Sequence, residues 1–213
     1  MAEKNNKTLP VLKNNKIAII FLLAITIFYT AFVIKTNQDK ELDVFELPQI
    51  NDENIYFGKK DSDNEILFLF DYSCPYCHDW VNDIFPAVKE KWLQSGKAKF
   101  SAQSMVYLNE TSLKVSKIDQ NIKEHYPEKY YDWFFSVMQN QNDQTDLEDN
   151  VNEQIAKYSI DENVVSSKPN VNVLSVTRSY TKTYKVEYVP TLIINGRKVE
   201  DPFDLKEIEG LLK

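Results

Sequence analysis

The stretch from Glu65 to Trp80, EILFLFDYSCPYCHDW, constrains this chain more than any other part of its 213 residues. Ile66 to Phe70 is an unbroken apolar and aromatic run without glycine, which is typical of a buried strand. After the polar turn that follows it, apolar residues recur at a spacing of about 3.6 residues, which predicts a helix over roughly residues 74–91. Pro86 is expected to kink this helix or to start a second one. A buried strand therefore leads into a helix that begins at a pair of cysteines.

The two cysteines, Cys74 and Cys77, occupy positions that suit dithiol redox chemistry. Cys74 is expected at the helix N-terminus, where unpaired N–H groups and the positive end of the helix dipole stabilise a thiolate. Pro75 suits a first helical turn, and Ser73 is a candidate N-cap. Cys77 lies three residues further on, close enough to resolve a mixed disulfide. Because the chain has only these two cysteines, we predict a redox enzyme.

The N-terminus contains a long apolar segment. Residues 17–34, IAIIFLLAITIFYTAFVI, include 18 residues without a charge, which is near the minimum for a transmembrane helix. Lysines dominate residues 1–16, so the positive-inside rule places this tail in the cytoplasm and the bulk of the chain outside. We predict a single-pass anchor in the cell membrane, with a cleaved signal peptide as the alternative. The extracytoplasmic side is where disulfides form and persist.

Charge and glycine content argue against other functions. The formal net charge is −7, and the 21 basic and 31 acidic residues that follow residue 34 leave −10 for the remainder. We do not expect so acidic a domain to bind nucleic acid. The four glycines are scattered singly, so no glycine-rich loop is present to hold a phosphate. We expect no cofactor and no metal.

The order of predicted elements is βαβ, then helices, then ββα. Residues 35–60 are a polar linker with a short strand near residues 55–57, and residues 97–106 form a second strand parallel to the first. Amphipathic helices are predicted at about residues 113–122, 129–138, 147–158 and 170–185. The aromatic residues of the second helix, including Tyr130, Trp133 and Phe134, are interpreted as core rather than as a ligand groove. Asn195-Gly196 between two β-rich runs predicts a tight hairpin, and residues 203–212 a final helix.

This pattern resembles the thioredoxin superfamily, and within it the DsbA-like thiol–disulfide oxidoreductases of the BdbD type. The resemblance is carried by FDYSCPYC at 70–77, by the helical insertion and by VPTLIING at 189–196. It implies an α/β thioredoxin fold over residues 61–213 with an inserted helical subdomain at about 111–185, preceded by the transmembrane helix. It further implies a cis-proline at Pro190 beside the cysteines, with a hydrophobic residue, Val189, before it.

The resemblance also implies an activity and partners. Cys74 would be the attacking cysteine and Cys77 the resolving one, and the pair would introduce disulfides into exported proteins that carry free thiols. A DsbB- or VKOR-like membrane quinone reductase would reoxidise the pair. Tyr76 stands where some members have histidine, which predicts a less extreme oxidant. The same site acting as a reductase or isomerase is the alternative, since redox poise and partner decide the direction.

Several polar positions near the motif are open to more than one interpretation. In many relatives a carboxylate lies six residues before the first cysteine and helps to move the proton of the buried thiol, whereas this chain has Phe68. Asp71 is closer to the first cysteine in the sequence, but because it lies at a strand end its side chain is expected to point away from the buried thiol. We interpret His78 as a solvent-exposed helix residue, with thiolate stabilisation as the alternative because it lies four residues after Cys74. His125 is assigned to a surface turn.

The cysteine motif also allows functions of other classes. The segment 74–78 matches the C-x-x-C-H pattern of c-type haem attachment, in which His78 would be one axial ligand and Met105, Met138 or His125 the other. A zinc site would draw on the two cysteines and two histidines, but it lacks a second ligand pair with metal spacing. A non-catalytic, membrane-tethered binding domain would leave the cysteine pair without a role. The strand before the motif and the Val189-Pro190 strand favour the dithiol enzyme.

Overall fold

The computed structural model describes residues 25–27, 29–30, 55–142 and 144–212. The chain divides into two compact units, Met1–Phe45 and Glu46–Lys213. In the first unit, residues 25–27 and 29–30 are helical. The rest of the membrane anchor predicted at 17–34 lies outside the described residues. Within those that are described, no helix is both long enough and apolar enough to cross a membrane.

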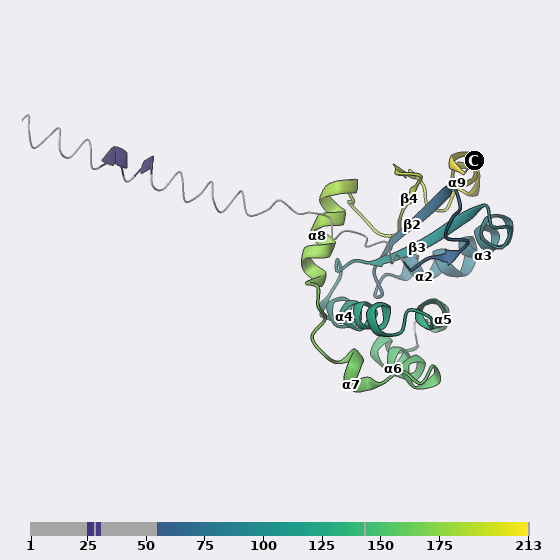
Figure 1. Ribbon diagram of the computed structural model, residues 1–213, viewed down its shortest axis with the longest axis horizontal. Coiled ribbons are helices and arrows are strands. Elements are labelled where there is room, and N and C mark those ends of the chain that lie inside the picture. Colours follow the sequence, from purple (N-terminus) through teal and green to yellow (C-terminus); the bar gives the residue numbers. More distant parts are fainter. Residues whose placement is uncertain (1–24, 28, 31–54, 143, 213) are drawn as a thin grey trace, which may run out of the picture. The chain divides into compact units, whose positions relative to one another are not determined.

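Within the described part of the second unit, the strands form one sheet in the order β1-β3-β2-β4-β5; Figure 1 labels β3, β2 and β4 of this sheet. These strands are β1 (Phe57–Gly58), β2 (Asn64–Phe70), β3 (Ala98–Ser104), β4 (Thr191–Ile194) and β5 (Arg197–Lys198). Strands β2 and β3 are parallel, which confirms the predicted βαβ unit, and β1, β4 and β5 are joined by antiparallel pairing. The sheet is therefore mixed, with the strand that precedes the cysteines at its centre.

Strand β2 is buried on both faces. Phe68 and its even-numbered neighbours lie in one apolar cluster, whereas Leu69 and Leu67 lie in another, because successive side chains of a strand point to opposite faces. The second cluster is completed by Val176 and Tyr180 of helix α8 (Val173–Tyr184). Burial on both sides explains why the run from Ile66 to Phe70 contains no polar residue.

The residues after the cysteines form one helical path with two kinds of turn. Helix α2 (Pro75–Asp79) is followed by the π-helical segment η1 (Trp80–Ile84), by α3 (Phe85–Val88) and by a second π-helical segment, η2 (Lys89–Leu93). Pro86 has no N–H, and its ring collides with the carbonyl four residues earlier. The N–H of Phe85 bonds to the carbonyl of Trp80, five residues back. Pro86 was predicted to kink the helix or to start a second one; it lies in the first turn of α3, after a wider π-helical turn, on a helical path that continues from α2.

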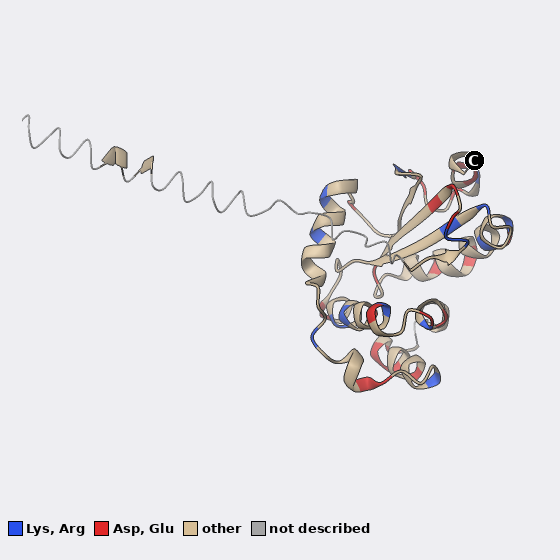
Figure 2. Cartoon of the chain, in the orientation of Figure 1, with Lys and Arg blue, Asp and Glu red and all other residues tan. Residues whose placement is uncertain are grey.

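The segment between β3 and β4 is the helical insertion. Its elements are α4 (Glu110–His125), α5 (Tyr130–Asn140), α6 (Leu147–Lys157), α7 (Glu162–Val165) and α8, and acidic residues outnumber basic ones on α6 (Figure 2). The four predicted helices are confirmed, whereas α7 was not predicted because one turn is too short to show periodicity. Tyr130, Trp133 and Phe134 of α5 are fully buried in the same cluster as Phe68. Their interpretation as core residues is therefore confirmed.

The C-terminal ββα segment follows its predicted turn chemistry. Asn195 and Gly196 both have positive φ values, 51° and 77°, as a two-residue type I′ hairpin requires. The Asn195 side chain also accepts a hydrogen bond from the N–H of Glu65 at 2.9 Å and donates to the carbonyl of Leu211 at 2.9 Å. This turn therefore connects β2 with helix α9 (Leu205–Leu211), whose N-cap is Asp204.

Candidate active site

Cys74 and Cys77 lie at the start of α2 as two unlinked thiols, with exposed fractions of 4% and 0%. Pro75 occupies the first turn of α2, as predicted, but the N-cap is Cys74 and no side chain caps the helix. The prediction of Ser73 as the N-cap is wrong, because its hydroxyl donates to the side chain of Asn109 at 3.1 Å. The helix N-terminus therefore begins at the first cysteine itself.

The two thiols have opposite acidities. The pKa of Cys74 is lowered, first because the Cys77 side chain forms a hydrogen bond with its sulfur; desolvation opposes this, and backbone N–H groups of Cys77 and Tyr76 assist it. The pKa of Cys77 is raised well above its ordinary value, chiefly because burial disfavours the charged form and also because of the hydrogen bond with Cys74. Cys74 is thus suited to be the thiolate, and Cys77 to remain protonated beside it.

The residues before β4 lie on the other side of the first cysteine. The Val189–Pro190 peptide bond is cis, as the resemblance implies. The Cys74 thiol donates to the carbonyl of Val189 at 3.5 Å, across a sequence separation of 115 residues. Pairing of Leu69 with Thr191, the first residue of β4, brings this segment to the end of β2. The structure therefore brings the cysteine motif and Val189-Pro190 together.

Asp71, at the end of β2, is fully buried and accepts four hydrogen bonds. The donors are the N–H of Ser73 at 2.8 Å, the hydroxyl of Ser112 at 2.6 Å, and the N–H groups of Tyr107 and Leu108 at 2.8 and 3.2 Å. They come from the motif turn, from the loop after β3 and from the first turn of α4. The side chain was expected to point away from the buried thiol, and its hydrogen bonds go to these segments, yet its charge still contributes to raising the pKa of Cys77 and opposes thiolate formation at Cys74.

The position six residues before Cys74 belongs to the apolar core. Phe68 is fully buried, and its ring stacks on that of Trp80 with centroids 4.4 Å apart. The indole N–H of Trp80 donates to the carbonyl of Pro202 at 2.8 Å. No carboxylate occupies this place, and Asp71 is the carboxylate whose charge reaches Cys77.

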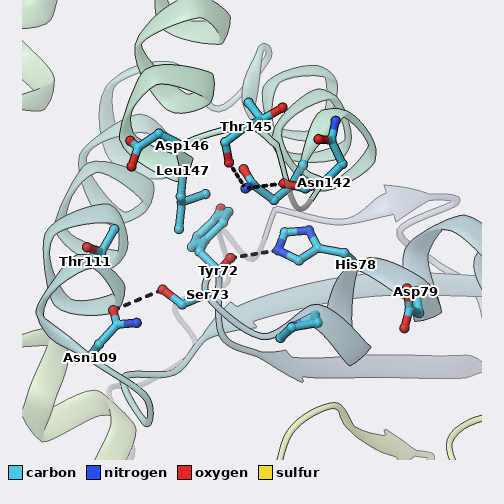
Figure 3. A pocket seen from close by; sticks show the side chains of 12 residues that line it. Tyr72, Ser73, His78, Asp79, Asn109, Thr111, Asn142, Thr145, Asp146 and Leu147 are labelled. Carbon is cyan, nitrogen blue, oxygen red and sulfur yellow. Dashed lines mark hydrogen bonds between the residues drawn. The ribbon is translucent and has the colours of Figure 1, made fainter.

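His78 is buried, so its interpretation as a solvent-exposed residue is wrong; its exposed fraction is 7%. Its Nε2 lies 2.8 Å from the carbonyl oxygen of Tyr72 (Figure 3). Its Nδ1 lies 3.0 Å from the carbonyl oxygen of Met138, at the end of α5. Packing of α5 against α2 covers this helix face, which local sequence does not reveal. His78 therefore joins the motif to the insertion. His125 is exposed at the end of α4 rather than in a turn.

A buried polar network beneath the motif was not predicted. Asp119 of α4, with an exposed fraction of 1%, accepts from the hydroxyls of Tyr72 at 2.7 Å and Tyr130 at 2.9 Å. Lys123 lies 2.9 Å from the other carboxylate oxygen. Burial raises the pKa of Tyr72 and of Tyr130 well above the ordinary value of a tyrosine. Both hydroxyls therefore stay protonated and donate to Asp119. The spacing of Asp119 and Lys123, four residues apart on α4, is the one sequence signal for this network.

The surroundings of the two cysteines and of His78 argue against the metal and haem alternatives. Across residues 55–142 and 144–212, and the few described before them, no three His, Cys, Asp or Glu side chains form a group that could hold a metal ion. Both ring nitrogens of His78 already face main-chain carbonyls, so neither is free to be the axial ligand that a haem at this motif needs.

Two cysteines of opposite acidity, at the end of a central strand and beside a cis-proline, define a thiol–disulfide exchange protein with a thioredoxin fold. A family model described as thioredoxin matches residues 51–213. The probable disulfide bond formation protein D of Bacillus cereus is 21% identical over 210 residues, covering 91% of this chain and 94% of the relative. The chain belongs to the thioredoxin family, and it is a DsbA-like thiol–disulfide oxidoreductase homologous to BdbD.

Solved structures show the same fold. The crystal structure of oxidised BdbD from Bacillus subtilis matches with a TM-score of 0.64 at 17% identity, covering 78% of this chain and 94% of that one. The thiol–disulfide exchange protein α-DsbA2 from Wolbachia pipientis matches with a TM-score of 0.58 at 22% identity, covering 78% and 92% of the two chains. At this level of identity the likeness concerns the fold.

Proposed function

We propose that this protein is an extracytoplasmic oxidase that introduces disulfide bonds into exported proteins through the Cys74–Cys77 pair. The observation that carries the proposal is the position of Cys74 at the N-cap of α2 beside a fully buried Cys77, which lowers the pKa of Cys74 and raises that of Cys77. Stabilising the Cys74 thiolate stabilises the reduced enzyme, and a stabilised reduced form makes the disulfide a stronger oxidant. Tyr76 has an exposed fraction of 66% and offers only a phenol where some relatives have histidine, so we expect a less extreme oxidant.

The first step forms a mixed disulfide. A substrate thiolate attacks the sulfur of Cys74 in the oxidised enzyme, a new sulfur–sulfur bond forms, and the Cys74–Cys77 bond breaks. Cys77 leaves as a thiolate and takes up a proton, which its raised pKa favours. Asp71 opposes negative charge at this sulfur and thereby favours its protonation.

The second step releases the product. A second thiolate of the substrate attacks the substrate sulfur of the mixed disulfide, forms the substrate disulfide and expels Cys74 as a thiolate. The lowered pKa of Cys74 makes it the better leaving group. The enzyme is then reduced and holds two more electrons than before. We propose that a DsbB- or VKOR-like membrane quinone reductase accepts these electrons and re-forms the Cys74–Cys77 disulfide.

The residues around the pair have supporting roles in this proposal. Pro75 starts the helix at the reactive cysteine, and the backbone N–H of Tyr76 assists the thiolate. Val189 and Pro190 present a main-chain carbonyl to Cys74, where the backbone of a bound substrate would pass. His78 contacts the carbonyl of Tyr72 within the motif turn and holds the motif against α5 through the carbonyl of Met138.

We also propose the bounds of the domains and their positions relative to the membrane. Residues 1–16 form a cytoplasmic tail, 17–34 a single transmembrane anchor, 35–60 a linker, and 61–213 the thioredoxin-like domain with its insertion at about 111–185. The uncharged length of residues 17–34 and the lysines before them support this arrangement. It places the cysteine pair on the extracytoplasmic side of the cell membrane, where exported thiols arrive.

The test is the reduction potential of the Cys74–Cys77 pair. The full-length chain in mild detergent is equilibrated with mixtures of reduced and oxidised glutathione, and the disulfide fraction is read by thiol alkylation and mass. We expect a value between that of DsbA, about −120 mV, and that of protein disulfide isomerase, about −180 mV. A value near that of thioredoxin, about −270 mV, would overturn the oxidase assignment. Cys77→Ser is the control, because it cannot form the internal disulfide.

A reductase or isomerase with the same site is the second candidate. The observation in its favour is the negative charge of Asp71, which opposes thiolate formation at Cys74 and so disfavours the reduced form. The potential decides between the two directions.

A further inference from the structure

A polar cavity of about 400 Å³ lies against the motif on the side of the insertion (Figure 3). Ser73 and Pro75, the two chain neighbours of Cys74, both line it. Across the cavity, Thr145 and Asp146 belong to the segment where the chain enters α6. The cavity therefore extends from the immediate neighbours of the reactive cysteine to the N-terminus of α6.

The chemistry of the wall is that of a site for a cation. Hydroxyl and amide groups make up much of it, and these include Ser73, Asn109, Thr111, Gln141, Asn142 and Thr145. Two carboxylates, Asp79 and Asp146, line it at opposite ends of the view in Figure 3, and the described residues that line it include no lysine or arginine. Asp146 uses one oxygen to accept from two N–H groups of α6. Neither carboxylate forms an ion pair with another described residue.

The reaction brings a polypeptide to this place. A substrate cysteine bonded to Cys74 holds its own chain at the surface beside Pro75, which is exposed. An extended chain advances about 3.4 Å per residue, so residues next to the substrate cysteine lie beside either the cavity or the Val189–Pro190 segment. A long, flexible side chain from one of these positions has access to the cavity.

We propose that this cavity is a specificity subsite that takes a lysine or arginine side chain adjacent to the substrate cysteine being oxidised. The proposal rests on the oxidase function above and names a class of substrate for it. Hydroxyl and amide oxygens accept hydrogen bonds from the cationic group, and Asp79 and Asp146 attract it. An acidic side chain at the same position is repelled, which contributes to discrimination between substrates.

The test compares peptides that differ next to one cysteine. Two-cysteine peptides carry Lys, norleucine or Glu beside the first cysteine, and the oxidised full-length chain in detergent oxidises each of them in stopped flow. Every rate constant is divided by that of the same peptide with oxidised glutathione, because a neighbouring charge also changes the thiolate fraction of the peptide itself. We expect the normalised rate to be about two- to fivefold higher for Lys than for norleucine, the size of an exposed ion pair, and lowest for Glu.

Three enzyme variants locate the effect. Asp146→Asn removes the charge but keeps a good helix N-cap, and Asp79→Asn removes the other carboxylate. Asp83→Asn is the matched control, because it makes the same change on the adjoining helical segment but does not line the cavity. We expect the preference for Lys over Glu to fall in the first two variants and to persist in the third.

Two results would overturn the subsite. One is equal normalised rates for the Lys and Glu peptides; the other is a preference that Asp83→Asn reduces as much as Asp146→Asn does, since this indicates the general acidic field of the domain. Failure to oxidise any peptide is distinct from both, because it removes the oxidase function on which the subsite rests.

Discussion

The two sides of the cysteine pair differ in how firmly they are held. On the side of the cis-proline, the described contact to the Cys74 sulfur from outside the motif is the carbonyl of Val189 at 3.5 Å, and the nearby Tyr188 is exposed. On the side of the insertion, Asp71 accepts four hydrogen bonds and His78 contacts two carbonyls. We interpret the first side as open for exchange and the second as the support that fixes the geometry of the motif.

This contrast has an energetic meaning. A group on the supported side is buried, so removing it leaves donors or acceptors without partners, which costs about 1–3 kcal/mol each. A group on the open side can exchange its partner for water or substrate. Changes on the supported side should therefore lower the free energy of unfolding, whereas changes at the cysteines should alter reactivity.

The largest expected loss of stability is at Asp71. Asp71→Ala leaves the buried Ser112 hydroxyl and up to three part-buried N–H groups without their acceptor, so we expect the free energy of unfolding to fall by about 3 kcal/mol. Urea unfolding of the reduced chain, followed by tryptophan fluorescence, measures it. Asp83→Ala, at an exposed carboxylate, is the control and should change stability by less than about 0.5 kcal/mol. Equal losses in the two variants would contradict the supporting role of Asp71.

A smaller loss of stability is expected when His78 is replaced. His78→Ala removes the contact with Met138 at the end of α5 and the contact with Tyr72 in the turn before α2, and we expect the free energy of unfolding to fall by about 1–3 kcal/mol. The chain offers a matched control in His125→Ala, because this histidine is exposed at the end of α4 and its loss should cost less than about 0.5 kcal/mol. The same urea experiment compares them. A His78→Ala variant as stable as His125→Ala would show that the contacts to Tyr72 and Met138 contribute little.

The smallest effects concern the acidity of Cys74. Alkylation of the reduced chain by iodoacetamide follows the thiolate, so its rate should rise with pH through a midpoint below the ordinary range of a cysteine, because the pKa of Cys74 is lowered. Cys77→Ala removes the largest cause of this lowering and should move the midpoint to higher pH. Asp71→Asn removes a charge that opposes the thiolate and should move it to lower pH. Shifts in the same direction for both variants would contradict this account.

Local sequence already contained most of the fold. The apolar run from Ile66 to Phe70 predicted the central strand, and helical periodicity predicted α4, α5, α6 and α8. Asn195-Gly196 predicted the hairpin because few residues adopt two successive positive φ values. The position of Cys74 and Cys77 at a strand–helix junction indicated dithiol chemistry, and resemblance to a known family supplied the cis-proline. Each of these signals lies within a few residues, or within a motif, and is therefore readable in one chain.

The surroundings of the site were decided by tertiary structure. Asp71 meets Tyr107, Leu108 and Ser112, residues 36 to 41 positions away, and His78 meets Met138 across 60 positions. Periodicity shows which face of a helix is apolar, but not which other element will cover a polar position such as His78. The sequence by itself therefore determined the elements and the reactive pair. The burial of His78, three of the four donors to Asp71 and the cavity beside Pro75 arise only when the insertion packs against the motif, because they depend on contacts between distant segments.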